Sequence, residues 1–526
     1  MSGAGLWLNI GMMVTLCTFI MIGLPVVFIL TGCAMFFGGL GIALGVFDSF
    51  LLGALAQRIF GTMTSEMLIA IPLFIFMGMM LERSRIAPDL LEAMGRLFGK
   101  RNGGLAISVT LVGALLGASA GVVGATVVTM GLIALPAMMR HRYEPGFATG
   151  SICAAGTLGQ LIPPATVMIV LGEVLASAYQ QAQLNQGLFS IDTISVGDLY
   201  AGAMIPSLLL TALYIIYQAV LCWLRPATGP AVPPSEAGTV SAAQLVEVLV
   251  APIVLLIAIL GSTLAGIATP TESAAVGAVG ATLLAGLRAS QEGNRGSPLP
   301  IHLAHAAALL LVALGLAFDL RLGRQEAPWL DQAALVLAGV FTIVLAWGIV
   351  VSLWRTFRNG ILGPTSHATM SVTAMIFATL IGATLFSLVF RGLGGDDVVR
   401  AFLDAVPGGK YGALFVVMLV IFILGFPLDF VEIVIIVVPI TGPVLMQMGV
   451  DPIWLGVLIA LNLQTSFLTP PLGPTLFYIQ GVLPAGVTSQ DVYRGIIPFV
   501  GIQVLMLTLV VIFPILATWL PKLLFG

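Results

Sequence analysis

Two parts of this chain match each other at a constant offset of 307 residues. The matching prolines are Pro136, Pro145, Pro163 and Pro164 in the first part and Pro443, Pro452, Pro470 and Pro471 in the second. Proline lacks an N–H donor and disfavours a helical conformation in the residue before it, so each double proline interrupts a helix. Equivalent interruptions in two membrane-length segments are typical of secondary transporters, whose binding sites lie at broken helices.

Long apolar segments recur from one end of the chain to the other. Hydrophobic residues make up 59% of the chain and charged residues only 8%, and about 20 apolar residues suffice to span a bilayer. No polar stretch is long enough for a soluble domain, which argues against nucleic-acid binding and soluble enzyme chemistry. The first apolar segment lacks a basic start and a cleavage site, so we expect a span there rather than a signal peptide. We expect an all-α polytopic integral membrane protein.

A polar loop divides the chain into two halves of similar organisation. Residues 1–224 form the first repeat half, 248–526 the second, and 225–247 a flexible loop rich in Pro, Gly, Ala and Ser. Each half is predicted to hold an interfacial amphipathic arm followed by a hairpin and broken-helix block. The arms are expected at 83–101 and 394–410, and the blocks at 104–178 and 412–482. Residues 288–364 have no counterpart in the first half, and we expect a peripheral inserted helical pair there.

The first proline-marked block is rich in glycine and hydroxyl groups. Its paired prolines leave carbonyl groups without helical partners, which lipid tolerates only where the backbone lines a cavity or meets a ligand. Such carbonyls and hydroxyls are the hard oxygens that Na⁺ prefers. We expect an ion or substrate site in this block, and its candidate residues are Ser119, Gly121, Thr126, Gly156, Thr157, Pro163 and Pro164. For the GxxxG-spaced glycines Gly113, Gly117 and Gly121, close helix packing is the alternative.

The second block offers more side-chain oxygens. Asp429 and Glu432 lie inside an apolar run at i, i+3 spacing, which predicts that they share a helix face. A carboxylate at the bilayer centre costs about 2.5–3.5 kcal/mol, so such a pair needs a cation, a proton or a partner. The alternative is a hairpin end near the interface, where this cost is small. The candidate site residues of this block are Asp429, Glu432, Asn462, Gln464, Thr465, Ser466, Thr469, Pro470 and Pro471.

A third segment carries a proline among polar residues. Thr269, Pro270, Thr271 and Glu272 mark a kink or a broken helix. Glu272 is either a third buried carboxylate or the cap of the helix that starts there, and the sequence favours the cap. Paired histidines elsewhere lack a neighbouring carboxylate or cysteine, so we expect no metal site other than sodium and no organic cofactor.

These segments together resemble the large membrane (M) subunit of the tripartite ATP-independent periplasmic (TRAP) transporters, DctM-like and in the longer branch of that family. The likeness rests on Tyr143-Glu144-Pro145, residues 156–164, 268–276 and 462–471, and Leu428-Asp429 with Glu432. It covers almost the whole chain except 288–364. Compact members of the family lack that insertion, and many carry a serine-rich stretch where this chain has residues 120–123.

The resemblance implies an inverted-repeat, elevator-type transporter in the bacterial cell inner membrane. Two re-entrant hairpins with broken helices would clasp sodium ions and an organic anion, such as a 2-oxo acid or a C4-dicarboxylate. Residues 119–126 and 156–164 would form one clamp, and Asp429, Glu432 and residues 462–471 the other. A periplasmic substrate-binding protein (P) would deliver the substrate, and a small four-helix membrane subunit (Q) would complete the scaffold.

Two other functions are compatible with a polytopic chain. A stand-alone sodium-coupled carboxylate symporter of similar design would need no binding protein. A membrane enzyme would need a catalytic grouping, to which Asp429 with Glu432 is the nearest approach, and no motif around that pair fits. We therefore expect no catalytic residues and no enzyme activity.

Overall fold

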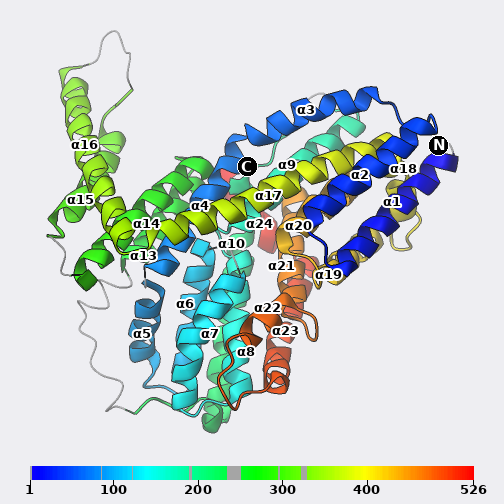
Figure 1. Cartoon of the computed structure of the whole chain (residues 1–526). Coiled ribbons are helices and arrows are strands. Elements are labelled where there is room, and N and C mark those ends of the chain that lie inside the picture. Colours follow the sequence, from blue (N-terminus) through cyan, green and yellow to red (C-terminus); the bar gives the residue numbers. More distant parts are fainter. Residues whose placement is uncertain are drawn as a thin grey trace.

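The computed structural model shows a chain of long helices that pack side by side (Figure 1). The structure describes residues 3–84, 86–120, 123–188, 192–233, 250–293, 297–321 and 328–526. Over these ranges the regular secondary structure is helical, without β-strands. The expectation of an all-α fold with broken helices is confirmed.

The helices of the first half precede the polar loop. They are α1 (Gly3–Ile22), α2 (Val26–Ala43), α3 (Phe50–Met63), α4 (Glu66–Arg83), α5 (Ile86–Phe98), α6 (Gly104–Ala120), α7 (Val123–Arg140), α8 (Pro145–Thr157), the 3-10 turn η1 (Leu158–Gln160), α9 (Thr166–Asn185), α10 (Val196–Leu224) and the 3-10 turn η2 (Pro226–Thr228). The polar loop starts at η2, where the N–H of Gly103 donates to the carbonyl of Gly229 at 2.7 Å. Most of the predicted flexible loop, from residue 234 on, lies outside the described residues.

The second half continues after the loop. Its helices are α13 (Ala251–Leu264), α14 (Pro270–Gly293), α15 (Leu299–Ala317), α16 (Trp329–Arg358), α17 (Leu362–Gly392), α18 (Gly395–Asp404), α19 (Gly409–Leu424), α20 (Phe430–Gln447), α21 (Pro452–Leu468), α22 (Pro474–Gln480), α23 (Ser489–Ile512) and α24 (Ile515–Phe525). The predicted insertion contains α15 and α16, which pack on each other and project from one end of the molecule (Figure 1).

Many of these helices are suited to a bilayer. Ten helices in the described part of the chain are long and apolar enough to cross a membrane, or up to twelve if each of two bent pairs is one span. The bent pairs are α3 with α4, at 48°, and α18 with α19, at 119°. Large apolar side chains lie exposed along outer helices such as α1 and α16, as expected for surfaces in contact with lipid. The chain is a multi-pass membrane protein.

Helix boundaries repeat with the offset seen in the sequence. Helices α7 and α20 are both 18 residues long and begin 307 residues apart. Helices α8 and α21 begin at the equivalent residues Pro145 and Pro452. The first helical position suits proline because its missing N–H has no intrahelical partner there. Asp451 also caps α21, since its side chain accepts hydrogen bonds from the N–H groups of Ile453 and Trp454.

Two short amphipathic helices precede the hairpin blocks. Helix α5 falls within the predicted arm at 83–101, and α18 within the one at 394–410. On α5, Leu90 is buried while Glu92 and Arg96 pair on the exposed side. Asp89 joins this helix to α14 through an ion pair with Arg288 at 2.7 Å. Helix α5 is thereby tied to α14, while α18 contacts α1, α17 and α20.

Glycines bring α8 and α23 into backbone contact. A Cβ atom on Gly495 would overlap the carbonyl of Gly146, and one on Gly150 would overlap the carbonyl of Gly495. Close approach of this kind lets van der Waals packing replace the hydrophobic drive that helices lack inside a bilayer. The contact joins the first hairpin block to the penultimate helix of the chain.

We predict that Gly495→Ala lowers the midpoint of thermal unfolding, because the new methyl group meets backbone that has no freedom to yield. Overpacking of this kind costs about 1–3 kcal/mol. Gly501→Ala on the same helix is the matched control, since a Cβ atom there meets open space. Thermal unfolding of the detergent-purified proteins checks this. Equal midpoints for the two variants would contradict the packing.

Candidate functional site

Two helical hairpins and two interrupted helices meet in the middle of the fold. Helices α6 and α7 form the first hairpin, and α19 and α20 form the second. Each is followed by a helix that stops before a double proline: α8 ends at Thr157, and α21 ends at Leu468. The peptide bonds Pro163–Pro164 and Pro470–Pro471 are both cis. The chain resumes as α9 in the first repeat and as the shorter α22 in the second.

Each interrupted helix packs against the hairpin of the other repeat. Helix α9 lies along α20, where a Cβ atom on Gly442 would contact Ala178 at 3.3 Å. In the equivalent place α22 lies against α7, where a Cβ atom on Gly124 would meet the ring of Tyr478 at 3.1 Å. The two repeats are thereby interlocked. We call this arrangement the crossed packing.

Thr157 and its repeat equivalent Gln464 contact each other at the centre of the crossed packing. The Nε2 of Gln464 lies 3.5 Å from the Thr157 Oγ1, and the Nε2 of Gln503 on α23 donates to the same oxygen at 3.3 Å. The three side chains are almost completely buried. The Oε1 atoms of both glutamines have no hydrogen-bond partner among the described residues. A buried amide oxygen without a partner is costly, so these two oxygens are candidate ligands for a cation.

The first predicted clamp combines packing positions with polar ones. Cβ atoms on Gly113 and Gly117 would overlap Ala155 and Gly159, so these two glycines serve close packing. A Cβ atom on Gly156 would overlap Val127 on α7, so this predicted site residue also packs tightly. Thr126 is buried on α7. Gly121 and the side chain of Ser119 lie outside the described residues.

Asp429 stands at the tip of the second hairpin and not on a helix face. It is the N-cap residue of α20, is exposed, and its N–H donates to the Oε2 of Glu432 at 3.2 Å. The expectation that the two carboxylates share a helix face is therefore wrong, because Asp429 precedes the helix and the pair stands at a hairpin end. The i, i+3 spacing arises because a capping box joins the N-cap residue to the third residue of the helix.

The polar run before the second break fastens α21 to the hairpin. The Nδ2 of Asn462 donates to the carbonyl of Met418 at 2.7 Å, and the Oγ of Ser466 donates to that of Phe422 at 2.7 Å. The hydroxyls of Thr465 and Thr469 donate to carbonyls four residues earlier, at 2.7 Å each. Four of the predicted clamp side chains therefore already have backbone partners in this structure.

The third predicted segment starts a helix. Pro270 is the first residue of α14, and the Oε2 of Glu272 accepts from the N–H of Thr269 at 2.8 Å. Glu272 is exposed and caps the helix, as the sequence favoured. The hydroxyl of Thr271 donates to the carbonyl of Glu66 at 2.6 Å, which joins α14 to α4 of the first half.

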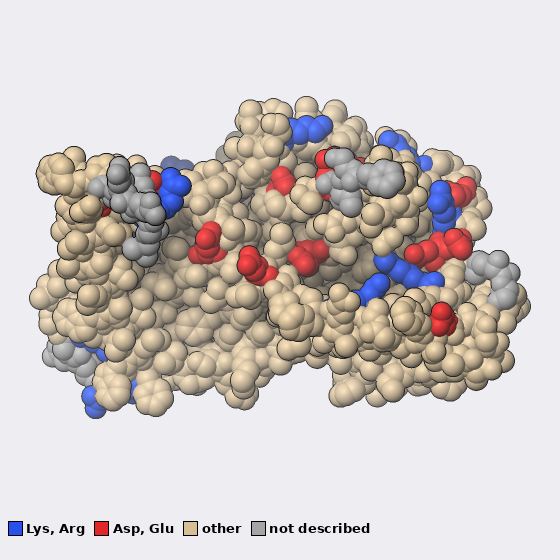
Figure 2. Space-filling view, turned by 90° about the horizontal axis from the view of Figure 1, so that it is seen from above, with Lys and Arg blue, Asp and Glu red and all other residues tan. Residues whose placement is uncertain are grey.

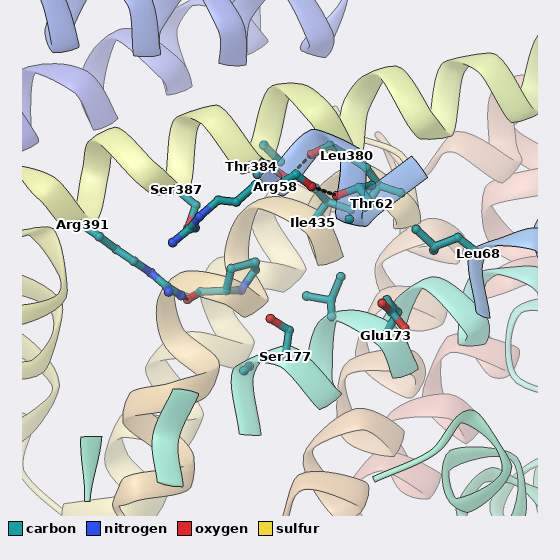
Figure 3. A pocket seen from close by; sticks show the side chains of 15 residues that line it. Arg58, Thr62, Leu68, Glu173, Ser177, Leu380, Thr384, Ser387, Arg391 and Ile435 are labelled. Carbon is teal, nitrogen blue, oxygen red and sulfur yellow. Dashed lines mark hydrogen bonds between the residues drawn. The ribbon is translucent and has the colours of Figure 1, made fainter. Parts of the chain in front are cut away.

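A cavity of about 440 Å³, lined by charged, hydroxyl and apolar side chains, contains none of the clamp residues and was not predicted (Figure 3). It is bounded by α3, α9, α17 and α20. Its charged side chains are Arg58, Arg391 and Glu173. The face of the molecule drawn in Figure 2 is hollowed, and acidic and basic side chains gather along the hollow. The sequence signal for this cavity was the presence of isolated charges in apolar segments, which usually mark functional positions.

The chain matches a known family and several of its members over most of its length. Residues 13–516 match the family described as "Tripartite ATP-independent periplasmic transporter, DctM component". The chain is 27% identical over 476 residues to the C4-dicarboxylate TRAP transporter large permease protein DctM of Vibrio cholerae, covering 90% of each chain. It is 24% identical to the ectoine TRAP transporter large permease protein TeaC of Halomonas elongata, covering 98% of this chain and 99% of that one.

A solved structure supports the fold alone. The chain is similar to the Alcanivorax borkumensis YdaH transporter, with a TM-score of 0.53 and 18% sequence identity, covering 90% of each chain. At that identity the likeness concerns the arrangement of helices and not the ligand.

We predict that Thr157→Val lowers the thermal midpoint by a few degrees, because the Nε2 groups of Gln464 and Gln503 lose the oxygen they face. Hydrogen bonds between membrane helices contribute about 0.6 kcal/mol on average and up to about 1.7. The matched control is Thr508→Val, whose exposed hydroxyl bonds only within its own helix. Identical unfolding curves for the two variants would show that the central contact is energetically unimportant.

Proposed function

Because the chain belongs to the DctM component of the tripartite ATP-independent periplasmic transporters, we propose that it imports a small organic acid together with sodium ions. As a transporter permease subunit it is not an enzyme. The observation that carries the proposal is the crossed packing of broken helices and hairpins. Broken helices inside a bilayer offer carbonyl groups and helix ends to ions and anionic substrates.

The crossed packing supports an elevator mechanism. Because α9 lies against α20 and α22 against α7, neither hairpin moves independently without losing these contacts. We propose that α6–α9 and α19–α23 move as one unit against the remaining helices, because α23 is in backbone contact with α8. The amphipathic helices α5 and α18 connect this unit to the scaffold, and the hairpin tips close around the cargo.

The buried oxygens near Thr157 fit a sodium ion. Hard cations prefer oxygen ligands, and the Oε1 atoms of Gln464 and Gln503 are buried without partners among the described residues. A half-turn of each amide exchanges its oxygen and nitrogen, which would bring two amide oxygens toward the Thr157 hydroxyl. We propose sodium binding here and at the two predicted clamps. Asp429, exposed at the hairpin tip, supplies a negative charge to the proposed second clamp.

The proposed cargo is a small carboxylate. Two relatives are named for C4-dicarboxylate and for ectoine, and both of these compounds are small and carry a carboxylate group. We propose an organic acid of this size, such as a 2-oxo acid or a C4-dicarboxylate, held between the two clamps.

The proposed partners are a periplasmic substrate-binding protein and a small four-helix membrane subunit in the bacterial inner membrane. The family description supports a tripartite assembly. The outer helices, with large exposed apolar side chains such as Trp347 and Trp354 on α16, leave room for a membrane-embedded partner. A stand-alone symporter remains the alternative, and it would transport without the binding protein.

We predict that uptake into proteoliposomes containing the complete complex needs an inward sodium gradient and no ATP, because the clamps bind ion and acid together. Radiolabelled organic acids, presented with the binding protein, provide the measurement. Uptake that persists when choline replaces sodium would overturn sodium coupling. Uptake that persists without the binding protein would favour the stand-alone symporter.

We also predict that Asp429→Asn and Thr469→Ala reduce sodium-dependent uptake about tenfold or more, which corresponds to about 1.4 kcal/mol. Asp404→Asn, an exposed carboxylate on α18 that pairs with Arg400, is the control. All three proteins should unfold at similar temperatures. Parental transport rates in both clamp variants would misplace the second clamp.

A further inference from the structure

The cavity between α3, α9, α17 and α20 contains opposite charges that do not meet (Figure 3). Arg58 of α3 and Arg391 of α17 direct their guanidinium groups toward the same part of the cavity, and Glu173 of α9 lies on the other side. Neither arginine forms an ion pair with Glu173 in the described structure. None of these residues belongs to the two clamps.

Arg391, at the positive end of the cavity, is held in place by neighbouring groups. Arg391 is held by the carbonyl of Pro439 at 3.0 Å and by the Oε1 of Gln181 at 3.3 Å, with Asp396 at 3.7 Å from its Nε. Arg58 forms no ion pair in the part of the chain that the structure describes, and it lies close enough to Arg391 for their charges to repel. An anion placed between two guanidinium groups relieves this repulsion and accepts charge-assisted hydrogen bonds.

The opposite end selects for a hydrogen-bond donor. Glu173 is half-buried, and its Oε1 accepts a hydrogen bond from Ser65 at 3.3 Å, which leaves its carboxylate with further acceptor capacity. Hydroxyl groups line the space between the ends, contributed by Thr62, Ser177, Thr384 and Ser387. Because Asp396 already pairs with Arg391, Arg58 is the arginine of the cavity without an ion pair in the described structure, and its single charge matches a monoanion better than a dianion. The cavity volume of about 440 Å³ lies within the usual range for small-molecule sites.

We propose that this cavity is a binding site for a small hydroxylated monocarboxylate, with its carboxylate on Arg58 and Arg391 and its hydroxyl directed to Glu173. The hollow, charge-lined face in Figure 2 favours a ligand from water over a lipid headgroup. The site joins α3 and α17 to α9 and α20, so its ligand bridges helices on both sides of the proposed moving boundary. Binding itself does not depend on the proposed transport.

The test is calorimetric titration of L-lactate into the full chain in phosphatidylcholine nanodiscs, in sodium-free buffer so that sodium-dependent clamps do not contribute. Arg58→Gln should weaken lactate binding about tenfold or more, as expected for losing a charged hydrogen bond. Arg101→Gln, exposed and outside the cavity, should bind like the parent protein. Propionate, which lacks the hydroxyl, should bind several-fold more weakly than lactate.

A second variant tests the charge balance. Glu173→Gln raises the lining charge by one unit, so the preference should shift toward the dianion succinate over lactate. The proposal is overturned if the parent protein does not bind lactate at millimolar concentration. A lactate affinity of Arg58→Gln within twofold of the parent also overturns it. So does phospholipid that co-purifies with the parent protein, but not with Arg58→Gln, while lactate fails to bind. If the parent protein binds lactate but the complete complex shows no sodium-driven uptake, only the proposed function is contradicted.

Discussion

The crossed packing is the contact on which the rest of this structure depends. Helix α9 lies on the second hairpin and α22 on the first, and Thr157 meets Gln464 where the two repeats face each other. Because the hydrophobic effect does not drive helices together inside a bilayer, such an assembly is held by close helix packing and buried hydrogen bonds. Glycines allow the close packing, and the side-chain amides of Asn462, Gln464 and Gln503 donate the buried hydrogen bonds. Several polar residues that the sequence suggests as ligands therefore also hold the helices together.

This double use explains which features the sequence predicted. Apolar runs and the double prolines act locally, so the helices, the interruptions and the amphipathic α5 and α18 could be located from residue patterns alone. The cap by Glu272 was also a local decision, since Thr269 lies three residues away. The transport family followed from several such segments in order, because each alone is common but their succession is not.

The features that could not be predicted from the sequence depend on tertiary contacts. The i, i+3 spacing of Asp429 and Glu432 suits a helix face and a capping box equally, and the start of α20 at Phe430 decides for the capping box. Gln503 approaches Thr157 across 346 residues, and Arg58 approaches Arg391 across a similar distance in the chain. Pairings of that kind leave no periodicity to read. Gly156 was assigned to a site although its neighbour Val127 on α7 leaves no space for a side chain.

The equal lengths of α7 and α20 have a consequence for how such a chain can diverge. Their shared 307-residue register gives the two repeats the same number of residues from the start of α7 or α20 to the double proline. An inserted residue there would rotate every later side chain by about 100° around the helix axis, and the partner repeat would no longer find its groove. Helices α15 and α16 lie between the blocks, where added length changes no such rotation. Evolutionary freedom in this architecture is therefore confined to the stretches that join the interlocked parts.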